Sequence, residues 1–294
     1  MSAKKIDKLA TFVLYVISGL IVLILASLLL YILFKGLPNV SWHFLTSPAK
    51  AYEAGGGIGI QLFNSFFLLL ITMLISFPIS LGAGIYLSEY AKDNWLTRLI
   101  RTAIEILSSL PSVVVGLFGF LIFVIQIGYG FSILSGALAL TVFNLPLMTR
   151  NVEESLHAIS FTQREAGLAL GLSRWETVLH VIIPEALPGI ITGIVLSSGR
   201  IFGEAAALIY TAGQSAPALD WSNWNPLSVS SPISIFRQAE TLAVHIWKVN
   251  SEGNIPDAAQ VSAGASAVLI IAVLIFNFSA RFIGKKLHAK LTSA

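Results

Sequence analysis

The 294-residue sequence contains no cysteine and few charged side chains. Without cysteine, the chain has no disulfide bond, thiolate metal site, iron–sulfur cluster or cysteine nucleophile. Charged residues make up 11% of the sequence, whereas soluble domains carry about 25%. So few charges cannot cover the surface of a folded monomer in water, which excludes a soluble protein. The net charge of +3 is also too small to indicate nucleic-acid binding.

Three further patterns are missing. The P-loop sequence GxxxxGK[ST] of ATP-binding proteins does not occur, so the chain is not expected to hydrolyse ATP itself. The five histidines lie scattered without the spacing of metal ligands, and no metal site is expected. The apolar stretches also lack a nucleophile–base cluster, which argues against a membrane enzyme.

Apolar residues are abundant, at 55% of the chain with a mean hydropathy of +0.82. A helix needs roughly 20 apolar residues to cross a bilayer core about 30 Å thick. Six stretches are long enough, so the predicted fold class is an all-α integral membrane protein with six transmembrane helices. The predicted spans are residues 11–34, 62–87, 104–127, 131–148, 189–210 and 262–283. The first is longer than a signal-peptide core and is interpreted as a retained anchor.

Lysine and arginine in the loops, in the tails and at the ends of the spans predict the orientation. Thirteen of these residues fall on one side of the membrane and four on the other. The thirteen are Lys4, Lys5, Lys8, Lys92, Arg98, Arg101, Arg150, Arg164, Arg174, Arg281, Lys285, Lys286 and Lys290, and the four are Lys35, Lys50, Arg237 and Lys248. Because positive charge is retained inside, residues 1–10 and 284–294 are predicted to be cytoplasmic. Residues 62–283 then form a membrane domain with loop 151–188 inside and loop 211–261 outside.

The inner loop 151–188 has the sequence of a structured element. Residues 162–165 and 173–176 each match a capping box, in which a Thr or Ser hydroxyl and a Glu carboxylate satisfy free N–H groups at a helix start. Gly171 is suited to end the first helix in a left-handed conformation. Pro184 and Pro188 are expected to break the chain before the next span. The prediction is two short helices with a bend at Gly171.

This loop is acidic, which bears on what it contacts. Its five glutamates outnumber its arginines, and an acidic loop is a poor ligand for anionic lipid headgroups. A protein partner is therefore favoured over the alternative, an amphipathic loop that rests on the membrane surface.

The sequence EAGLALGLSRWETVLHVIIP, residues 165–184, resembles the EAA motif of permeases from ABC importers. Glu165, Ala166, Gly171 and Pro184 match the motif at its spacing, and Gly167 stands where the motif has a second alanine. The resemblance implies a MetI-like permease fold. It also implies that this loop is the coupling helix that docks in a cleft of the ATP-hydrolysing subunit.

The resemblance extends over roughly residues 55 to 285 and is closest to permeases of phosphate importers, with the PstA-type subunit ahead of the PstC-type. The segments that carry it are Gly55–Gly59, Pro78–Ala91, Leu107–Gly119, Leu145–Leu156 and Gly199–Leu208. It implies a multi-pass subunit of the prokaryotic inner membrane that is not an enzyme. The implied partners are a PstC-type permease, an ATPase dimer that binds ATP and Mg, and a phosphate-binding protein, while this chain holds no cofactor.

Arg200 and Glu204 are ionisable residues near the middle of the predicted span 189–210. Their spacing predicts one helix face, and each charge costs about 2.5–3.5 kcal/mol at mid-bilayer, so neither should face lipid. A guanidinium fits two oxygens of a tetrahedral oxyanion, and Ser197 and Ser198 supply neutral donors nearby. The alternative is an ion pair that only holds helices together.

The resemblance assigns transport roles to Arg200, Glu204 and Arg150. Glu204 is hypothesised to accept the proton that phosphate carries and sulfate lacks. Arg150 has an equally good alternative as a positive anchor beside Glu153 and Glu154. For the protein as a whole, the alternatives are an importer of sulfate or molybdate, or an ion-coupled carrier. The carrier is disfavoured because no internal repeat is visible and the structured inner loop would have no role.

Overall fold

The computed structural model describes residues 3–253 and 255–292. The regular secondary structure of these residues is helical, with no strand. Residues 1–2 and 293–294, at the outer ends of the two predicted cytoplasmic termini, lie outside the described residues. In chain order the α-helices are α1 (Ala3–Gly36), α2 (Trp42–Thr46), α3 (Gly59–Ile85), α4 (Trp95–Ser108), α5 (Ser112–Gly119), α6 (Ile133–His157), α7 (Phe161–Ala169), α8 (Arg174–Thr177), α9 (Ile183–Gly203), α10 (Ala206–Thr211), α11 (Leu242–Glu252) and α12 (Ala258–Thr292). The 3-10 helix η1 (Leu37–Asn39) and the π-helices η2 (Tyr86–Tyr90), η3 (Phe120–Gln126) and η4 (Val178–Ile182) connect some of them.

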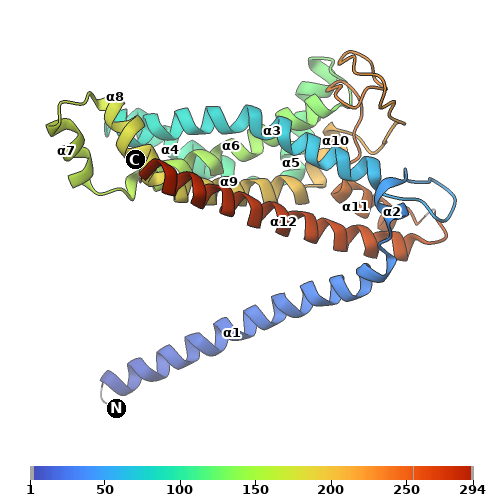
Figure 1. Ribbon diagram of the computed structural model, residues 1–294, viewed down its shortest axis with the longest axis horizontal. Helices are drawn as coiled ribbons and strands as arrows, with labels where there is room; N and C mark the ends of the chain where they lie inside the picture. The colour runs from blue at the N-terminus through green and yellow to red at the C-terminus, as the bar shows by residue number, and fades with distance from the viewer. Residues whose placement is uncertain (1–2, 254, 293–294) are drawn as a thin grey trace.

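The long helices α3, α6, α9 and α12 lie side by side and form the bundle seen in Figure 1. Helix α6 is the central one, because it packs against both α3 and α9 and is mostly buried. Leu68, Leu140, Phe202 and Leu208 belong to the core that joins these helices. Helices α7 and α8 project from one end of the bundle, while α2 and α11 lie at the other.

Helix α1 diverges from this bundle (Figure 1). Most of its apolar side chains between Leu9 and Phe34 are exposed, so this predicted span is one apolar helix whose surface the rest of the chain leaves largely uncovered. Its last turn packs on α12 at Gly36, where a Cβ atom would lie 2.2 Å from the Ala263 carbonyl oxygen. The beginning of α1 and the end of α12 both lie toward the same end of the molecule as α7 (Figure 1).

Five single helical segments are long and apolar enough to cross a membrane, and a bent pair makes a sixth candidate. The pair is α4 with α5–η3, bent by 100° at residues 109–111. The predicted span over residues 104–127 is therefore sharply bent, and this pair is either a broken span or a re-entrant loop. Pro111 stands at the bend, where its missing N–H and fixed ring interrupt the helix, and α4 begins earlier, at the Asn94 cap that accepts from the Thr97 N–H.

The predicted span 189–210 also differs at both ends. One continuous helical segment runs from Arg174 to Gly203 through α8, η4 and α9, so Pro184 and Pro188 do not break the chain as predicted. The π-helical turn η4 ends two residues before Pro184, and its wider hydrogen-bond ladder accommodates a residue without an N–H. At the other end the helix stops at Gly203, and α10 starts a separate segment.

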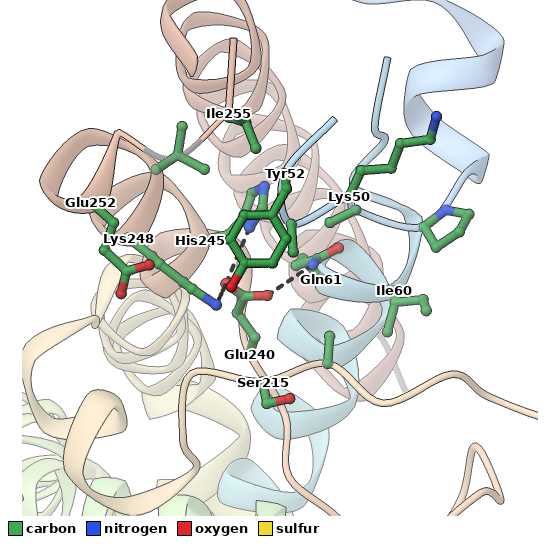
Figure 2. A pocket seen from close by; sticks show the side chains of 15 residues that line it. Lys50, Tyr52, Ile60, Gln61, Ser215, Glu240, His245, Lys248, Glu252 and Ile255 are labelled. Atoms are coloured by element: carbon green, nitrogen blue, oxygen red, sulfur yellow. Dashed lines mark hydrogen bonds and ion pairs between the residues drawn. The ribbon is translucent and has the colours of Figure 1, made fainter. Parts of the chain in front are cut away.

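A polar pocket lies at the end of the bundle opposite α7, shown in Figure 2. The buried Glu240 carboxylate accepts from Gln61 Nε2 on α3 at 2.9 Å and lies 3.1 Å from His245 Nδ1 on α11. Asn64 Nδ2 donates to the Glu240 backbone oxygen at 3.0 Å. These bonds join α3, α11 and the end of the long loop after α10, which gives the cluster a structural role.

Close packing of α5 on α10 generates a test of the bent pair. A Cβ at Gly116 would lie 2.7 Å from the Ala207 Cα, so Gly116→Ala must separate two backbones. We expect it to lower the free energy of unfolding by about 1–3 kcal/mol, measured as thermal unfolding of the purified protein in detergent. Gly82→Ala on α3, where a Cβ meets nothing within 4 Å, is the control and should not destabilise. Equal stability of the two variants would contradict the packing.

Candidate translocation site and docking surface

Arg200 lies in the last turn of α9, and its side chain stacks on an aromatic ring of the neighbouring helix α6. Its guanidinium carbon lies 3.5 Å from the centroid of the Phe143 ring on α6. Arg200 is half-buried, and among the described residues no side chain or backbone oxygen pairs with it. Stacking uses the face of the guanidinium and leaves its in-plane N–H groups available.

Glu204 lies one residue past the end of the helix that carries Arg200, so the two residues are not within one helix as predicted. No ion pair joins the two side chains within 4.0 Å, although the Glu204 charge still acts on the guanidinium. Helix α9 ends at Gly203, and Glu204 has extended backbone angles, φ −76° and ψ 122°. Its Oε1 atom accepts from the Ala207 N–H at 3.1 Å, which satisfies a free donor in the first turn of α10. The carboxylate thus stabilises the start of α10. Glycine is a poor helix former, so Gly203 also favours the end of α9 at this point.

Ser197 and Ser198 lie on α9 as expected, and both are completely buried. Neither hydroxyl has a hydrogen-bond partner in the described structure. Asn144, adjacent to Phe143 on α6, is also completely buried with both amide atoms unpartnered. The segments around Arg200 thus carry several buried polar atoms without hydrogen-bond partners. Each such group costs about 1–3 kcal/mol of stability. Sequence reasoning missed Phe143 and Asn144, although an asparagine within an apolar span was a visible signal.

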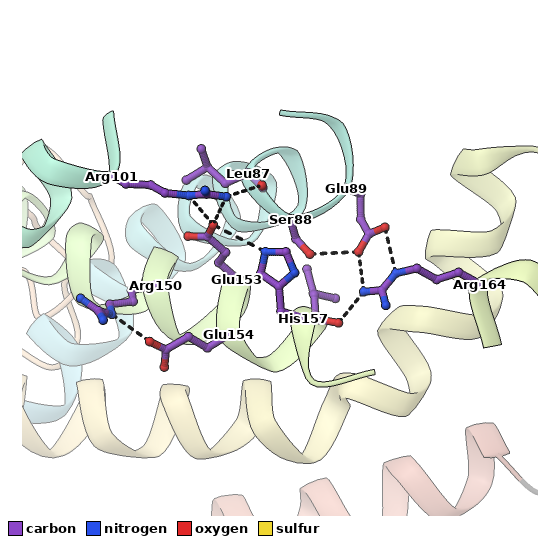
Figure 3. Close-up of polar contacts among 10 residues, drawn as sticks. Leu87, Ser88, Glu89, Arg101, Arg150, Glu153, Glu154, His157 and Arg164 are labelled. Carbon is purple, nitrogen blue, oxygen red and sulfur yellow. Dashed lines mark hydrogen bonds and ion pairs between the residues drawn. The ribbon is translucent and has the colours of Figure 1, made fainter. Parts of the chain in front are cut away.

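Arg150 lies elsewhere, at the α7 end of α6. Its guanidinium is exposed and pairs with Glu154 at 2.8 Å (Figure 3). It also pairs with Glu105 of α4 at 3.1 Å. Phe143 is one heptad away on the same helix, about 10 Å along the axis, so the structure does not bring Arg150 and Arg200 together. Arg150 pairs with Glu154, one of the two glutamates suggested for an anchor.

A second arginine joins the helix ends beside it. Arg101 of α4 pairs with Glu153 of α6 at 2.8 Å and donates to the Leu87 carbonyl of η2 at 3.2 Å (Figure 3). His157 Nε2 lies 3.8 Å from the same Glu153 carboxylate. Together with the Arg150 pairs, these contacts fix α4 to the end of α6.

The inner loop contains the start of two helices, α7 and α8, and only the second start has the predicted capping box. Ser173 and Glu176 form the predicted capping box: the Glu176 N–H donates to Ser173 Oγ at 3.3 Å, and the Ser173 N–H donates to Glu176 Oε2 at 2.8 Å. Thr162 does not cap a helix, because α7 already begins at Phe161 after Ser160. Gly171 has φ +84°, the left-handed conformation predicted for it.

Arg164 holds α7 against the rest of the chain. Its Nη2 atom lies 3.0 Å from Glu89 Oε1 and donates to the Leu156 carbonyl at 2.7 Å (Figure 3). Both side chains of the ion pair are largely buried, which makes it more than a surface contact.

Gly167 is buried where α7 meets α8. A Cβ added to it would lie 2.7 Å from Thr177 Cγ2. A glycine in place of the motif's alanine therefore lets the two helices approach more closely. Helices α7 and α8 therefore form one compact unit, which is joined directly to the long helical segment from Arg174 to Gly203.

The opposite side of this unit is exposed and apolar. Phe161, Leu168 and Trp175 are at least 47% exposed, and Leu170 is 83% exposed. Glu165 and Ala166 are exposed among them. Exposed apolar groups with one acidic residue are the composition of a protein-binding surface. We name this set of residues the docking surface.

Comparison with known proteins identifies the class. Residues 80–293 match the family of binding-protein-dependent transport system inner membrane components. The chain belongs to this family, so it is the membrane component of an ABC transport system rather than an enzyme. Membership of this family does not favour the alternative function as an ion-coupled carrier.

Particular relatives narrow the comparison. The chain is 53% identical over 293 residues, 100% of both chains, to the probable ABC transporter permease protein YqgI of Bacillus subtilis (strain 168). It is 34% identical over 268 residues, 88% of this chain and 85% of the relative, to the phosphate transport system permease protein PstA of Yersinia pestis. An inward-facing structure of the MetNI methionine ABC transporter superposes with a TM-score of 0.56 at 19% identity, covering 79% of this chain and 94% of that one. The all-helical, MetI-like fold is confirmed at this level.

The contact beneath Gly167 yields a paired test of the docking surface. Gly167→Ala should push α7 away from α8 and weaken binding of the transporter's ATPase at least about tenfold, equivalent to about 1.4 kcal/mol. Thr177→Ser removes the Cγ2 atom that clashes and keeps the hydroxyl that donates to the Ser173 carbonyl at 3.0 Å.

The double variant should therefore recover ATPase binding, and Thr177→Ser alone serves as the control. The measurement is co-purification of the ATPase with tagged chain. Gly167→Ala that binds normally, or that Thr177→Ser fails to rescue, would refute the arrangement.

Proposed function

We propose that this chain is a permease subunit of an ATP-driven phosphate importer in the prokaryotic inner membrane. A second permease of PstC type would complete the translocation path, and an extracytoplasmic binding protein would deliver phosphate. The observation that carries the proposal is Arg200, a cation among apolar helices that stacks on Phe143 and forms no ion pair or hydrogen bond with any described residue. The likeness to PstA of Yersinia pestis supports phosphate as the anion.

The surroundings of Arg200 suit a transient oxyanion. Its in-plane N–H groups can donate to two phosphate oxygens, while Phe143 holds the plane of the guanidinium. The unpartnered groups of Asn144, Ser197 and Ser198 are neutral, so they can donate to an anion without holding it tightly. Weak binding is required, since a transported ion must also leave.

The energy would come from a partner. ATP and Mg would bind to an ATPase dimer that contacts the docking surface, and this chain contributes no cofactor site. Movement of α7 would pass through the Gly167–Thr177 contact to the helical segment that starts at Arg174. That segment is continuous to Arg200, roughly 40 Å away at 1.5 Å per residue. Displacement at the docking surface can therefore tilt the helix that carries the cation.

Replacement of Arg200 tests this function. Arg200→Ala should reduce uptake of radiolabelled phosphate into proteoliposomes at least about tenfold, equivalent to about 1.4 kcal/mol of transition-state stabilisation. Arg200→Lys should recover only part of the uptake, because lysine keeps the charge and loses the planar fork. Arg98→Ala, an exposed arginine of α4, is the control. Normal phosphate uptake by Arg200→Ala would refute the proposal.

Glu204 gives a test of selectivity. Phosphate near neutral pH carries a proton that it can donate to a carboxylate, whereas sulfate carries none and is repelled. Glu204→Gln keeps an oxygen that can accept from the Ala207 N–H and removes the charge, so α10 should remain intact.

We expect this variant to admit sulfate, measured as sulfate inhibition of phosphate uptake in proteoliposomes, while the wild-type transporter resists it. Equal sulfate rejection by both proteins would show that Glu204 plays no part in selectivity. Import of sulfate in place of phosphate by the wild type would favour the alternative oxyanion importer.

A further inference from the structure

Arg237 is a buried cation that the proposed mechanism leaves unused. It lies between α10 and α11, on the outer side in the predicted orientation, and is only 1% exposed. Burial lowers its pKa to about 10, so it stays charged at neutral pH. Within the described parts of the chain, no carboxylate lies within 4.0 Å of its guanidinium.

The guanidinium is only partly satisfied. Its Nη1 atom donates to the Gln238 carbonyl at 3.2 Å, and Nη2 donates to the Pro232 carbonyl at 3.1 Å. The Nε atom is buried and has no partner. Because a guanidinium has five N–H groups, two carbonyl bonds leave most of its donors unused.

Two hydroxyls with the same deficiency belong to the same turn. Ser231 and Ser234 are completely buried, and neither Oγ atom has a partner. The Ser234 N–H donates to the Ser231 carbonyl at 3.2 Å, which closes the turn around Pro232, the residue that Arg237 holds. A purely structural arginine would explain the carbonyl bonds but not the two unpartnered hydroxyls in the turn that it holds. One full positive charge with hydroxyl donors is the composition of an oxyanion site.

The turn sits on the helix that leads to Arg200. The N–H of Ile133 donates to the Arg237 carbonyl at 3.0 Å, and the N–H of Leu134 donates to the Ile235 carbonyl at 2.8 Å. The segment from Ile235 to Arg237, which follows the turn, thus satisfies two free N–H groups at the outer end of α6. Phe143, on which Arg200 stacks, lies about 15 Å farther along this helix.

We propose that Ser231, Ser234 and Arg237 form a second, outer oxyanion site, closed in this structure, which phosphate occupies before it reaches Arg200. The identity of the anion rests on the proposed function, while the site itself rests on the unpartnered donors. Movement of the loop between α10 and α11 opens it. Two weak sites in series allow an ion to enter and to leave.

The double variant Ser231→Ala/Ser234→Ala tests the site in the assembled transporter. If the hydroxyls are merely structural, their removal leaves the transporter unchanged, since they make no hydrogen bond within the chain. The proposal instead expects the KM for phosphate uptake to rise about tenfold, the scale of one hydrogen bond to a charged group. The thermal stability of the transporter without phosphate should stay the same. Ser80→Ala on α3, another buried and unpartnered hydroxyl, is the matched control and should not change KM.

A binding measurement separates this site from the inner one. In the transporter with Arg200→Ala, inorganic phosphate should still raise the thermal unfolding midpoint. Adding Ser231→Ala/Ser234→Ala should abolish that shift. An unchanged KM in the serine variant, no shift with Arg200→Ala, or an equal shift with and without the serines overturns the outer site. If the wild type imports sulfate instead of phosphate, the proposed function fails, and the same titration with sulfate decides the outer site by itself.

Discussion

The arrangement of the bundle depends on how a charged guanidinium is accommodated among apolar helices. The usual solution is an ion pair, but the carboxylate nearest in sequence, Glu204, instead hydrogen-bonds to the backbone of α10. Arg200 lies on the Phe143 ring, which screens one face and leaves its donors without a protein acceptor. Because a charge without an ion-pair partner is costly within a membrane, we propose that an anion occupies this position transiently.

Helix continuity connects this cation to the exposed end of the molecule. The unit of α7 and α8 is held by the buried pair between Arg164 and Glu89 and by the tight contact at Gly167. From Arg174 the chain stays helical to Gly203. By contrast, the helix breaks at Pro111 and at Glu204 lie on neighbouring segments, since α5 packs on α10. A stiff element thus meets interrupted ones near the cation, which is where a change of shape is least costly.

Hydropathy predicted the membrane class, and it located the long spans because lipid requires about 20 apolar residues of helix. The capping box at Ser173 and the left-handed Gly171 followed from local chemistry. Prediction failed where a tertiary or non-α feature decided the outcome. The π-helical turn carries the helix through Pro184, and the sharp bend at Pro111 is hidden within an apolar stretch. Residue spacing placed Arg200 in the core, but the stacking on Phe143 requires a second helix that spacing cannot reveal.

The natural absence of cysteine allows a direct test of whether the unpartnered groups near Arg200 line the path. Ser197→Cys would introduce the single thiol of the chain at a position that is completely buried here. Labelling by a membrane-impermeant thiol reagent would be followed in the assembled transporter, at rest and during ATP turnover. The account predicts slow labelling at rest, faster labelling during turnover, and protection by saturating phosphate. Labelling that turnover and phosphate leave unchanged would contradict it.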